Sequence, residues 1–250
     1  TESAAEELIA DGERVVGVRV RRADGDVFVK ANKGVVVAVS SYERRQDFNR
    51  TLGQQLELGS MVFSSIDGAN FRLAGPLGAR NAKVPDITSL GFTVPGEEDE
   101  EGYPLWRTAL SALGQPHTMV VNRKGQRFGN EAFYRSFYYK IDQIEGSDQH
   151  HPNFPCWVIM DSQGREKYPF VSITPDQEWP AGFGAVADTL EELAAMIGID
   201  GKNLVETVAR FNRFAELGED PDFGRGSHPW SEWMCGDPFH KPNANLGTLT

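Results

Sequence analysis

The first forty residues alternate hydrophobic and polar positions in short runs that turn residues separate. Every second position from Val16 to Val20 is a valine, with glycine or arginine between. This period of two is typical of a half-exposed antiparallel strand. The dipeptides Asp11-Gly12 and Asp24-Gly25 favour tight turns on either side of it. The pattern therefore predicts an antiparallel β-meander over residues 3–39.

A continuous apolar run, Gly34-Val-Val-Val-Ala-Val39, closes this region. Because it shows no alternation, it predicts a strand that is buried on both faces, as in a parallel sheet. Ser40 and Ser41 follow, and serine is a good residue for capping a helix. The polar segment over residues 43–59 is expected to form that helix.

Two later segments carry apolar residues at helical spacing. Thr189-Leu-Glu-Glu192 is a capping box, and Gly198 marks the end of the helix that it begins. A second helix is expected to end at Gly218. Both helices read as scaffold, because their apolar residues form a single stripe. The stripe of the second helix consists of Leu204, Val208, Phe211 and Ala215.

The stretch from Val120 to Arg135 predicts a strand, a tight turn, a return strand and the start of a helix. The turn falls at Arg123-Lys124-Gly125, where glycine is free to take a positive φ. Arg127-Phe128 begins the expected return strand. Asn130 is the expected N-cap of the helix, which would place Glu131 at the positive end of the helix dipole.

This third helix is expected to have an apolar face and a face with one cation beside phenols. The apolar face would anchor the helix and leave the other side chains available. The apolar residues are Phe133, Phe137 and Ile141, and the other face carries Arg135, Tyr138 and Tyr139.

The remaining segments are expected to be largely irregular. Residues 84–103 read as a linker or loop, with the acid run Glu97–Glu101 on its solvated surface. Phe154–Met160 reads as a strand that enters a turn at Asp161–Gly164. The tail from Asp220 to Gly247 reads as a series of turns.

Composition excludes several classes of partner. The 250-residue chain has a net charge of −11 and a pI near 5.0, whereas nucleic acids and anionic membranes attract basic patches. No apolar run reaches the ~18 residues of a membrane span. Cys156 and Cys235 match no metal spacing, and His150-His151 has no further ligand at a suitable spacing, so no metal site is expected. We expect two free thiols in a reducing cytoplasm.

Several motifs resemble one family of flavoproteins. The segment Val120–Glu131 is similar to the VNRxGxRFxNE signature of the FAD-dependent superfamily of fumarate reductases, succinate dehydrogenase flavoproteins and 3-ketosteroid dehydrogenases. Ile66-Asp-Gly68, with the residues up to Ala79, resembles the GDG…RMA…GA segment of this superfamily. The tail from Asp220 to Gly247 resembles the 3-ketosteroid dehydrogenase branch. Together these matches span nearly the whole chain.

The resemblance implies an α+β fold. Part of an FAD-binding domain, consisting of the β-meander and a parallel-type strand, would join a capping domain of hairpin and helices. It assigns residues 1–82 to the FAD-binding domain, 83–240 to the capping domain and 241–250 to the start of the return to the FAD-binding domain. FAD is the expected cofactor. The residues expected near it are Ser40, Ser41, Tyr42, Asp67 and Gly68.

A phosphate-binding turn is missing from this pattern. No Gly-rich turn after a first strand precedes the expected cofactor residues, although a dinucleotide-binding domain needs one. The G-x-G-x-x-A match at Gly182–Ala187 follows Trp179-Pro180 rather than a strand, so we do not expect it to bind phosphate. The chain is therefore expected to be an internal fragment of a longer flavoprotein and to be inactive alone.

The resemblance implies an oxidoreductase that acts on a CH–CH bond of an apolar ketone such as a 3-ketosteroid. Arg135 occupies the position of the proton-transferring arginine of the reductases, and in the steroid dehydrogenases the same position holds a catalytic tyrosine. Tyr134 is the immediate neighbour of this position. Arg135 would favour C=C reduction or oxyanion stabilisation, since arginine stays protonated. Tyr134 would serve dehydrogenation if the register of the match slips by one residue. The expected substrate contacts are Leu90, Phe92 and Tyr138.

Several alternatives remain open. Arg135 could be a surface arginine that pairs with the many acids of this chain. The chain could be a non-catalytic, cap-like module that binds an apolar ligand or a partner protein. It could be a diverged flavoprotein, or a reductase of enones or dicarboxylates like the fumarate reductases. The segment Ile87–Phe92 has no histidine or arginine for a dicarboxylate. The residues do not specify the electron donor or acceptor.

Overall fold

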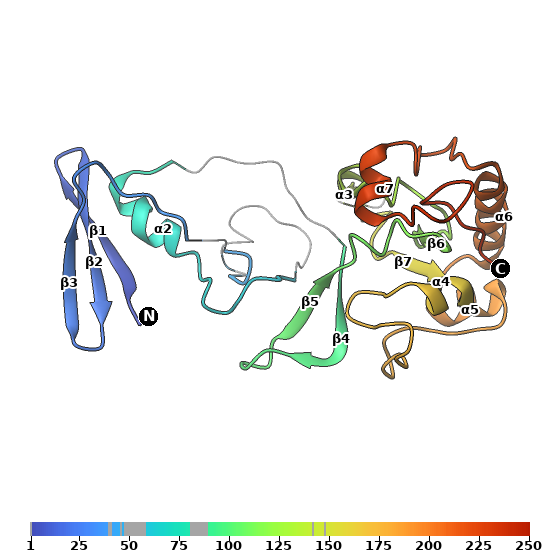
Figure 1. Cartoon of the computed structure of the whole chain (residues 1–250), viewed down its shortest axis with the longest axis horizontal. Coiled ribbons are helices and arrows are strands. Elements are labelled where there is room, and N and C mark those ends of the chain that lie inside the picture. Colours follow the sequence, from blue (N-terminus) through green and yellow to red (C-terminus); the bar gives the residue numbers. More distant parts are fainter. Residues whose placement is uncertain are drawn as a thin grey trace. The chain divides into compact units, whose positions relative to one another are not determined.

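The computed structural model describes residues 2–39, 42–45, 47, 59–80, 90–141, 143–147 and 149–250. The side chains of Tyr134 and Tyr138 are outside this description. The chain forms two compact units, Thr1–Pro85 and Asp86–Thr250. Each unit combines helices with small antiparallel sheets (Figure 1), so the expected α+β class is confirmed.

The first unit contains the predicted β-meander. Strands β1 (Ala4–Asp11), β2 (Arg14–Arg22) and β3 (Gly25–Lys30) form an antiparallel sheet in that order. Val18 lies opposite both Leu8 and Val29 in the register. The two connections are the predicted tight turns, and the blue arrows of Figure 1 are the three strands that they join.

The strand predicted over residues 34–39 is not formed. These residues have no strand partner within the described part of the chain, and Val36 is 90% exposed. A strand buried on both faces requires neighbouring strands and a covering layer, and apolar composition alone supplies neither. Most of the helix predicted over residues 43–59 falls outside the described residues.

A short helix packs on the meander. Helix α2 (Ala69–Ala74) begins after Gly68 and continues into the 3-10 turn η1 (Gly75–Leu77). Arg72 on α2 donates hydrogen bonds to the Glu6 carbonyl and carboxylate at 3.2 and 3.4 Å, which ties the helix to β1.

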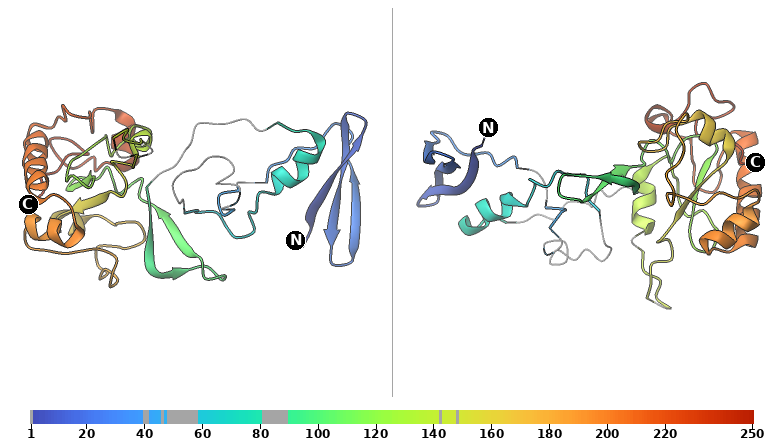
Figure 2. Two further views of the ribbon diagram at one scale, coloured as in Figure 1. Left: turned by 180° about the vertical axis from the view of Figure 1, so that it is seen from behind. Right: turned by 90° about the horizontal axis from the view of Figure 1, so that it is seen from below.

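The core of the second unit lies between a two-stranded sheet and two helices. Strand β6 (Thr118–Val121) is buried at all four residues and pairs antiparallel with β7 (Trp157–Met160). Helices α5 (Leu190–Ile197) and α6 (Gly201–Leu217) lie side by side in all views (Figures 1 and 2). The main buried cluster consists of Met119, Val121, Ile159, Ala194, Leu204, Val208, Phe211, Ala215, Leu246 and Leu249.

Both scaffold helices follow the sequence prediction. The Thr189 hydroxyl accepts the N–H of Glu192 at 3.2 Å and so caps α5. Gly198 and Gly218 end α5 and α6 with φ of 74° and 78°, the left-handed conformation that suits a helix C-terminus. The four predicted stripe residues of α6 are all buried, and their burial fixes α6 against β6.

The central segment differs from the prediction at two places. The turn forms, with the Gly125 N–H bonded to the Asn122 carbonyl at 2.9 Å, but the residues after it form no return strand. The partner of β6 is β7 instead. Helix α3 (Tyr134–Ile141) begins after Phe133, so Asn130 is not its N-cap. Asn130 and Glu131 instead make tertiary contacts, which are described below.

The apolar face predicted for this helix is only partly buried. Phe137 and Ile141 are 3% and 6% exposed, whereas Phe133 is 37% exposed. Phe133 precedes the first residue of α3, so its side chain does not follow the helical stripe. The interior anchor of α3 is therefore Phe137, whose ring packs on Phe128 with centroids 4.4 Å apart.

The expected linker over residues 84–103 is partly a hairpin. Strands β4 (Gly91–Glu98) and β5 (Pro104–Thr108) pair antiparallel. The Asp99 carboxylate accepts the N–H groups of Glu101 and Tyr103, which stabilises the turn between them. Part of the acid run therefore closes this hairpin, and Glu97 is not purely solvated, since it bonds Arg107 and Ser172.

Two further helices lie where turns were predicted. Asp161 accepts the N–H of Gly164 at 3.0 Å and caps α4 (Ser162–Lys167). Helix α7 (Pro229–Cys235) lies within the loop-rich tail and has proline at its first position. Both helices are short, and their apolar periodicity is too brief to be visible in the sequence.

Candidate functional site

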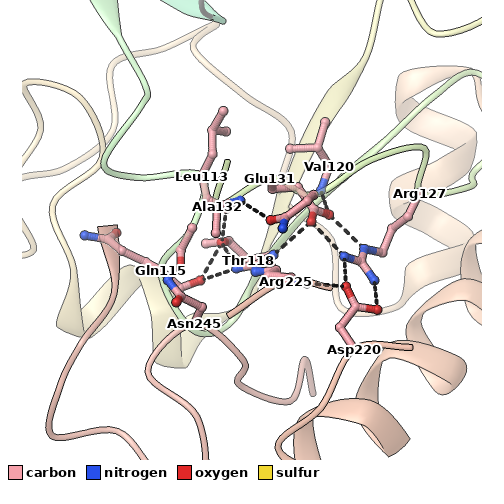
Figure 3. A network of polar contacts seen from close by, with 12 residues as sticks. Leu113, Gln115, Thr118, Val120, Arg127, Glu131, Ala132, Asp220, Arg225 and Asn245 are labelled. Atoms are coloured by element: carbon pink, nitrogen blue, oxygen red, sulfur yellow. Dashed lines mark hydrogen bonds and ion pairs between the residues drawn. The ribbon is translucent and has the colours of Figure 1, made fainter. Parts of the chain in front are cut away.

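A buried group of four charged residues holds the segment before α3 in place. Arg127 donates to both carboxylate oxygens of Glu131, at 2.8 and 2.7 Å, and to both oxygens of Asp220, at 3.2 and 2.8 Å. The second cation, Arg225, lies 3.6 Å from Glu131. Figure 3 shows Glu131 between the two guanidinium groups. We call these four residues the buried ion network.

The network also joins the tail to the start of β6. Arg225 is 1% exposed and donates to the carbonyls of Thr118 and Gln115, at 2.8 and 2.7 Å. The Phe211 ring of α6 lies under both guanidinium groups, 4.9 Å from Arg127 and 5.4 Å from Arg225. The two arginines thus balance the two acids, and apart from the Arg225 Nε, which has no partner among the described residues, the guanidinium groups are hydrogen-bonded. Pairing of this kind is the condition for burying ions without a large loss of stability.

The network also changes the acidity of its carboxylic acids. Burial opposes the ionisation of Glu131, but the Arg127 guanidinium outweighs this effect and lowers the pKa of Glu131 below its usual value. The pKa of Asp220 is lowered in the same way, by hydrogen bonds from Arg127 acting against burial. Both acids therefore remain charged partners for the arginines at neutral pH.

The residue predicted as a helix cap instead positions the turn before α3. The Asn130 side chain accepts the N–H of Ala132 at 3.0 Å and donates to the Gly224 carbonyl at 3.1 Å. The Asn130 carbonyl accepts the N–H of Phe133 at 3.1 Å. The buried ion network and this turn together fix where α3 starts, and Tyr134 and Arg135 are the first two residues of that helix.

The predicted catalytic residues are thus adjacent on a helix whose start is firmly held. Arg135 is exposed. Tyr139, on the same helix, is 59% exposed. The predicted substrate contact Tyr138 lies on α3 as well, with its side chain outside the described residues.

The other two predicted substrate contacts lie at the β4–β5 hairpin. The Leu90 carbonyl accepts the N–H of Ala109 at 3.0 Å and closes the base of the hairpin. Phe92 packs edge-on against Phe170, with centroids 5.1 Å apart. Phe170 in turn stacks on Trp179. Phe92 is therefore part of an aromatic cluster, which was not predicted.

In the first unit, the structure brings the predicted cofactor segments together. The Ser60 hydroxyl bonds the Glu43 carboxylate at 3.0 Å, and Arg45 reaches the Asp67 carbonyl at 3.5 Å. The Tyr42 ring packs edge-on against Phe71 at 5.2 Å. Tyr42, Asp67 and Gly68 therefore belong to one local cluster. Ser40 and Ser41 lie outside the described residues.

Two features of this cluster suit a cofactor with many polar groups. Gly68 is buried with φ of 75°, a conformation in which glycine lets other groups approach the backbone closely. The Asn70 side-chain oxygen is buried without a hydrogen-bond partner, and such an acceptor calls for a donor that the described residues do not provide. The residues present therefore fit an FAD-binding role.

The second unit also has an open pocket of about 540 Å³, away from the predicted catalytic residues. His117 and His240 line it, with ring centroids 5.1 Å apart. Each ring is fixed by a backbone carbonyl of the tail, Thr248 at 2.7 Å and Leu246 at 2.9 Å. Burial, followed by the neighbouring His117, lowers the pKa of His240. No predicted site residue lines this pocket.

Sequence reasoning missed the buried ion network. The i,i+4 spacing of Arg127 and Glu131 is a visible signal of a pair, but Glu131 was assigned to a helix dipole. Asp220 and Arg225 were read only as parts of a turn-rich tail. Because Asp220 and Arg225 lie far from Arg127 along the chain, no local sequence pattern indicates that they are in contact.

The described residues contain no group of three or more histidine, cysteine, aspartate or glutamate side chains that could hold a metal ion. Both cysteines are free thiols, with Cys235 buried and Cys156 half-buried. No helix among the described residues is both long and apolar enough to cross a membrane.

Comparison with known proteins identifies relatives over almost the whole chain. The chain is 31% identical to 3-oxosteroid 1-dehydrogenase of Mycolicibacterium smegmatis, over 99% of this chain and 45% of that protein. It is 33% identical to 4-oxocyclohex-2-ene-1-carboxylate 5-dehydrogenase of Sinomonas cyclohexanicum, over 88% of this chain and 38% of that protein. The chain thus spans less than half the length of these relatives.

A solved structure agrees with these relatives. The crystal structure of 3-ketosteroid Δ1-dehydrogenase from Sterolibacterium denitrificans, in complex with 1,4-androstadiene-3,17-dione, matches 99% of this chain and 45% of that one. Its TM-score is 0.77 and its sequence identity is 28%. The sequence profile of the FAD-binding domain family matches residues 1–249. The chain therefore belongs to the FAD-binding domain family of flavoproteins, and FAD, the expected cofactor, is confirmed.

Proposed function

We propose that this protein is an FAD-dependent dehydrogenase that acts on the CH–CH bond beside the carbonyl of an apolar ring ketone. The observation that carries the proposal is the match to such dehydrogenases over the whole chain, with a TM-score of 0.77 for one solved structure. The named relatives are dehydrogenases of oxosteroids and oxocyclohexane rings. A ketone on a ring is the feature that these substrates share.

In this proposal the two units have different roles. Residues 1–82, which fall within unit Thr1–Pro85, contribute to the FAD-binding domain. Residues 83–240 form the capping domain, and residues 241–250 lead back to the FAD-binding domain. Tyr42, Asp67 and Gly68, together with Ser40 and Ser41, contribute to holding the cofactor. FAD, when bound, supplies the acceptor for the hydride that leaves one carbon of the substrate.

The protein's own residues contribute the proton transfer. Removal of two hydrogens from a CH–CH bond releases one as a hydride and the other as a proton, and a protein group must take the proton. Tyr134, as the phenolate, takes this proton from the carbon next to the ketone and so acts as the general base. The Arg135 guanidinium stays protonated and can stabilise negative charge on the ketone oxygen. The buried ion network supports both residues by fixing the start of α3.

Because this chain spans less than half the length of its relatives, the experiment uses the full-length, FAD-loaded protein and an artificial electron-accepting dye. We expect a yellow flavin spectrum and dye reduction when a 3-ketosteroid is added. Tyr134→Phe removes the hydroxyl while keeping the ring, so dehydrogenation should fall by ~10²-fold or more. Arg135→Lys keeps a charge but loses the planar donor fork, so it should slow the reaction less. Colourless protein, or dye reduction that is insensitive to Tyr134→Phe, would contradict the proposal.

A further inference from the structure

The pocket beside His117 and His240 takes no part in the proposed function. Residues of α4, α6 and the tail line it, together with His117, which directly precedes β6. No residue of α3 is among them. Its volume of about 540 Å³ is in the range of sites for small organic molecules. The side chains of its lining that carry or can take up a charge are His117, Lys167, Glu216, His240 and Lys241.

Each imidazole ring of the pocket is held by one nitrogen and keeps the other one uncommitted. His117 Nδ1 lies 2.7 Å from the Thr248 carbonyl oxygen. His240 Nε2 lies 2.9 Å from the Leu246 carbonyl oxygen. A carbonyl oxygen can only accept, so these two nitrogens carry the hydrogen. The other nitrogen of each ring has no partner within the described part of the chain, and it becomes a further donor when the ring takes up a proton.

The backbone of the tail adds further donors. Gly247 and Thr248 both line the pocket, and Gly247 is buried. Their two N–H groups have no acceptor among the residues that the structure describes. A buried N–H group without an acceptor is rare, because it has lost its contact with water and has no bond in exchange. Successive N–H groups of this kind are typical of a place where the backbone binds an anion.

The lysines of the pocket differ in how far their charge is matched. Lys167 is paired with Asp237 at 2.7 Å. Lys241 donates to the Pro238 carbonyl at 3.2 Å and has no acid within 4.0 Å among the described residues. The one acid of the lining is Glu216, on α6. While both rings are neutral, the lining side chains therefore carry two positive charges and one negative charge.

Two more acids lie close to the lining, and both are already hydrogen-bonded. Asp237 accepts the Tyr168 hydroxyl at 2.7 Å in addition to Lys167. Asp161 accepts the side-chain N–H of Gln163 at 2.9 Å and the backbone N–H of Gly164 at 3.0 Å. Donors thus offset the charge of both carboxylates. Glu216 remains as the acid that an anion in the pocket would meet directly.

Protonation of the two rings makes the pocket more positive. Burial, followed by the neighbouring His117, lowers the pKa of His240, so this ring is mostly neutral at pH 7. A bound anion acts against this effect, because negative charge stabilises the protonated ring. Each proton adds one positive charge and one N–H donor. Anion and protons are therefore expected to bind together, more tightly as pH falls.

We propose that this pocket binds a small oxyanion, such as a carboxylate or a sulfate group, through His117, His240, Lys241 and the backbone N–H groups of Gly247 and Thr248, and that binding takes up protons. The inference goes beyond the proposed function, because it needs neither α3 nor the flavin. A metal ion fits the pocket less well, since the described residues offer no third histidine, cysteine or acid beside the two rings.

The test measures binding of sulfate and of acetate to the full-length, FAD-loaded protein by isothermal titration calorimetry. Titrations at about pH 6 and about pH 8, in buffers without other oxyanions, cover the range in which histidine changes its charge. Both probes keep a constant charge in this range, so the pH dependence reports the protons of the protein. We expect at least one probe to bind ~10-fold or more tightly at the lower pH. Binding of sulfate alone indicates an inorganic type of ligand, and binding of acetate alone indicates a carboxylic acid.

Two variants and a matched control separate the pocket from the fold. His240→Gln keeps an N–H donor for the Leu246 carbonyl but cannot take up a proton, so it should remove most of the gain at the lower pH. Glu216→Gln removes the acid of the lining and should tighten binding by ~5-fold at either pH, which a damaged fold would not do. Glu206→Gln makes the same change on α6 outside the pocket, where the side chain is 65% exposed, and should leave the affinity unchanged.

Three results would overturn the inference. The first is that neither probe binds at about pH 6. The second is binding of equal strength at both pH values without proton uptake, which is measured by repeating the titration in buffers of different ionisation enthalpy. The third is an equal effect of Glu216→Gln and Glu206→Gln, because net charge and not the pocket would then determine the affinity. A protein that binds the oxyanion as expected but oxidises no ketone would refute the proposed function and support this site.

Discussion

The guanidinium of Arg127 lies 2.8 Å from a carboxylate oxygen of Asp220, a residue 93 positions further along the chain. This contact joins the segment that enters α3 to the loop that follows α6. Both side chains are almost fully buried, with 4% and 0% exposure. The position of Tyr134 and Arg135 therefore depends on a pair of residues that do not touch the substrate in our proposal.

Removal of one acid from the buried ion network should destabilise the second unit strongly. Asp220→Asn leaves Arg127 and Arg225 with Glu131 as the one remaining acid of the network, and removing one partner of a buried ion pair costs about 3–5 kcal/mol. Asp222→Asn is the matched control, since it removes an acid two positions away that pairs with Arg210 at the surface, where the cost is below about 1 kcal/mol. Urea unfolding measures both. Equal losses in the two variants would show that the network does not carry the stability assigned to it.

Gly125 should be irreplaceable for steric reasons. Its φ is 67°, and a Cβ there would lie 2.6 Å from the Asp200 carbonyl oxygen and 2.8 Å from the Leu204 nitrogen. Gly125→Ala therefore combines backbone strain of about 1–2 kcal/mol with a clash against the start of α6. Gly182→Ala has a similar φ of 82° and open space around it, so it isolates the strain. Thermal unfolding should show a clearly larger loss for Gly125→Ala, and equal losses would contradict the packing.

Stability should fall in two stages on acidification. Because the pKa of His240 is lowered in the folded state, the unfolded chain binds the proton more readily, and stability is lost as pH falls below about 6.5. Glu131 and Asp220 also have lowered pKa values, so their contribution is present above about pH 4.3 and is lost below it. His240→Gln should remove the first stage and leave the second. An unchanged slope between pH 7 and 5 would show that His240 does not cause it.

Cys235 should react slowly with alkylating reagents in the native protein. The thiol is 5% exposed, and burial raises its pKa to about 11. Only the thiolate reacts, so about one molecule in a thousand is reactive at pH 8 even before access is considered. Mass spectrometry after timed iodoacetamide treatment measures the modification, with urea-unfolded protein as the fully reactive control. Rapid modification of native Cys235 would contradict its burial.

The regular elements were predictable from the sequence because local physics specifies them. The capping box at Thr189 and the apolar stripe from Leu204 to Ala215 determine α5 and α6 through contacts within a few residues. The alternating valines and the turn glycines determine the first sheet through local contacts in the same way. The strand predicted from the apolar run at 34–39 was wrong, because burial on both faces depends on partners that the run itself does not encode.

Only part of the candidate site could be predicted from the sequence. The motif around Arg127 and Glu131 pointed to the right family, but its charged residues turn out to be structural, as parts of the buried ion network. The partners Asp220 and Arg225 could not be found from spacing, since tertiary contacts over about 90 residues leave no periodic signal. Helix α7 was also missed, because it lies in a segment that was predicted to consist of turns.

The central claim is that α3 supplies the proton-transferring group of a flavin-dependent dehydrogenase. Anaerobic mixing of the FAD-loaded protein with a 3-ketosteroid tests it most directly, because bleaching of the flavin reports the hydride transfer without a further electron acceptor. We predict that the unmodified protein bleaches within a single turnover and that Tyr134→Phe binds the steroid but bleaches ~10²-fold more slowly. Bleaching at the same rate in both proteins, or none in either, would contradict the account.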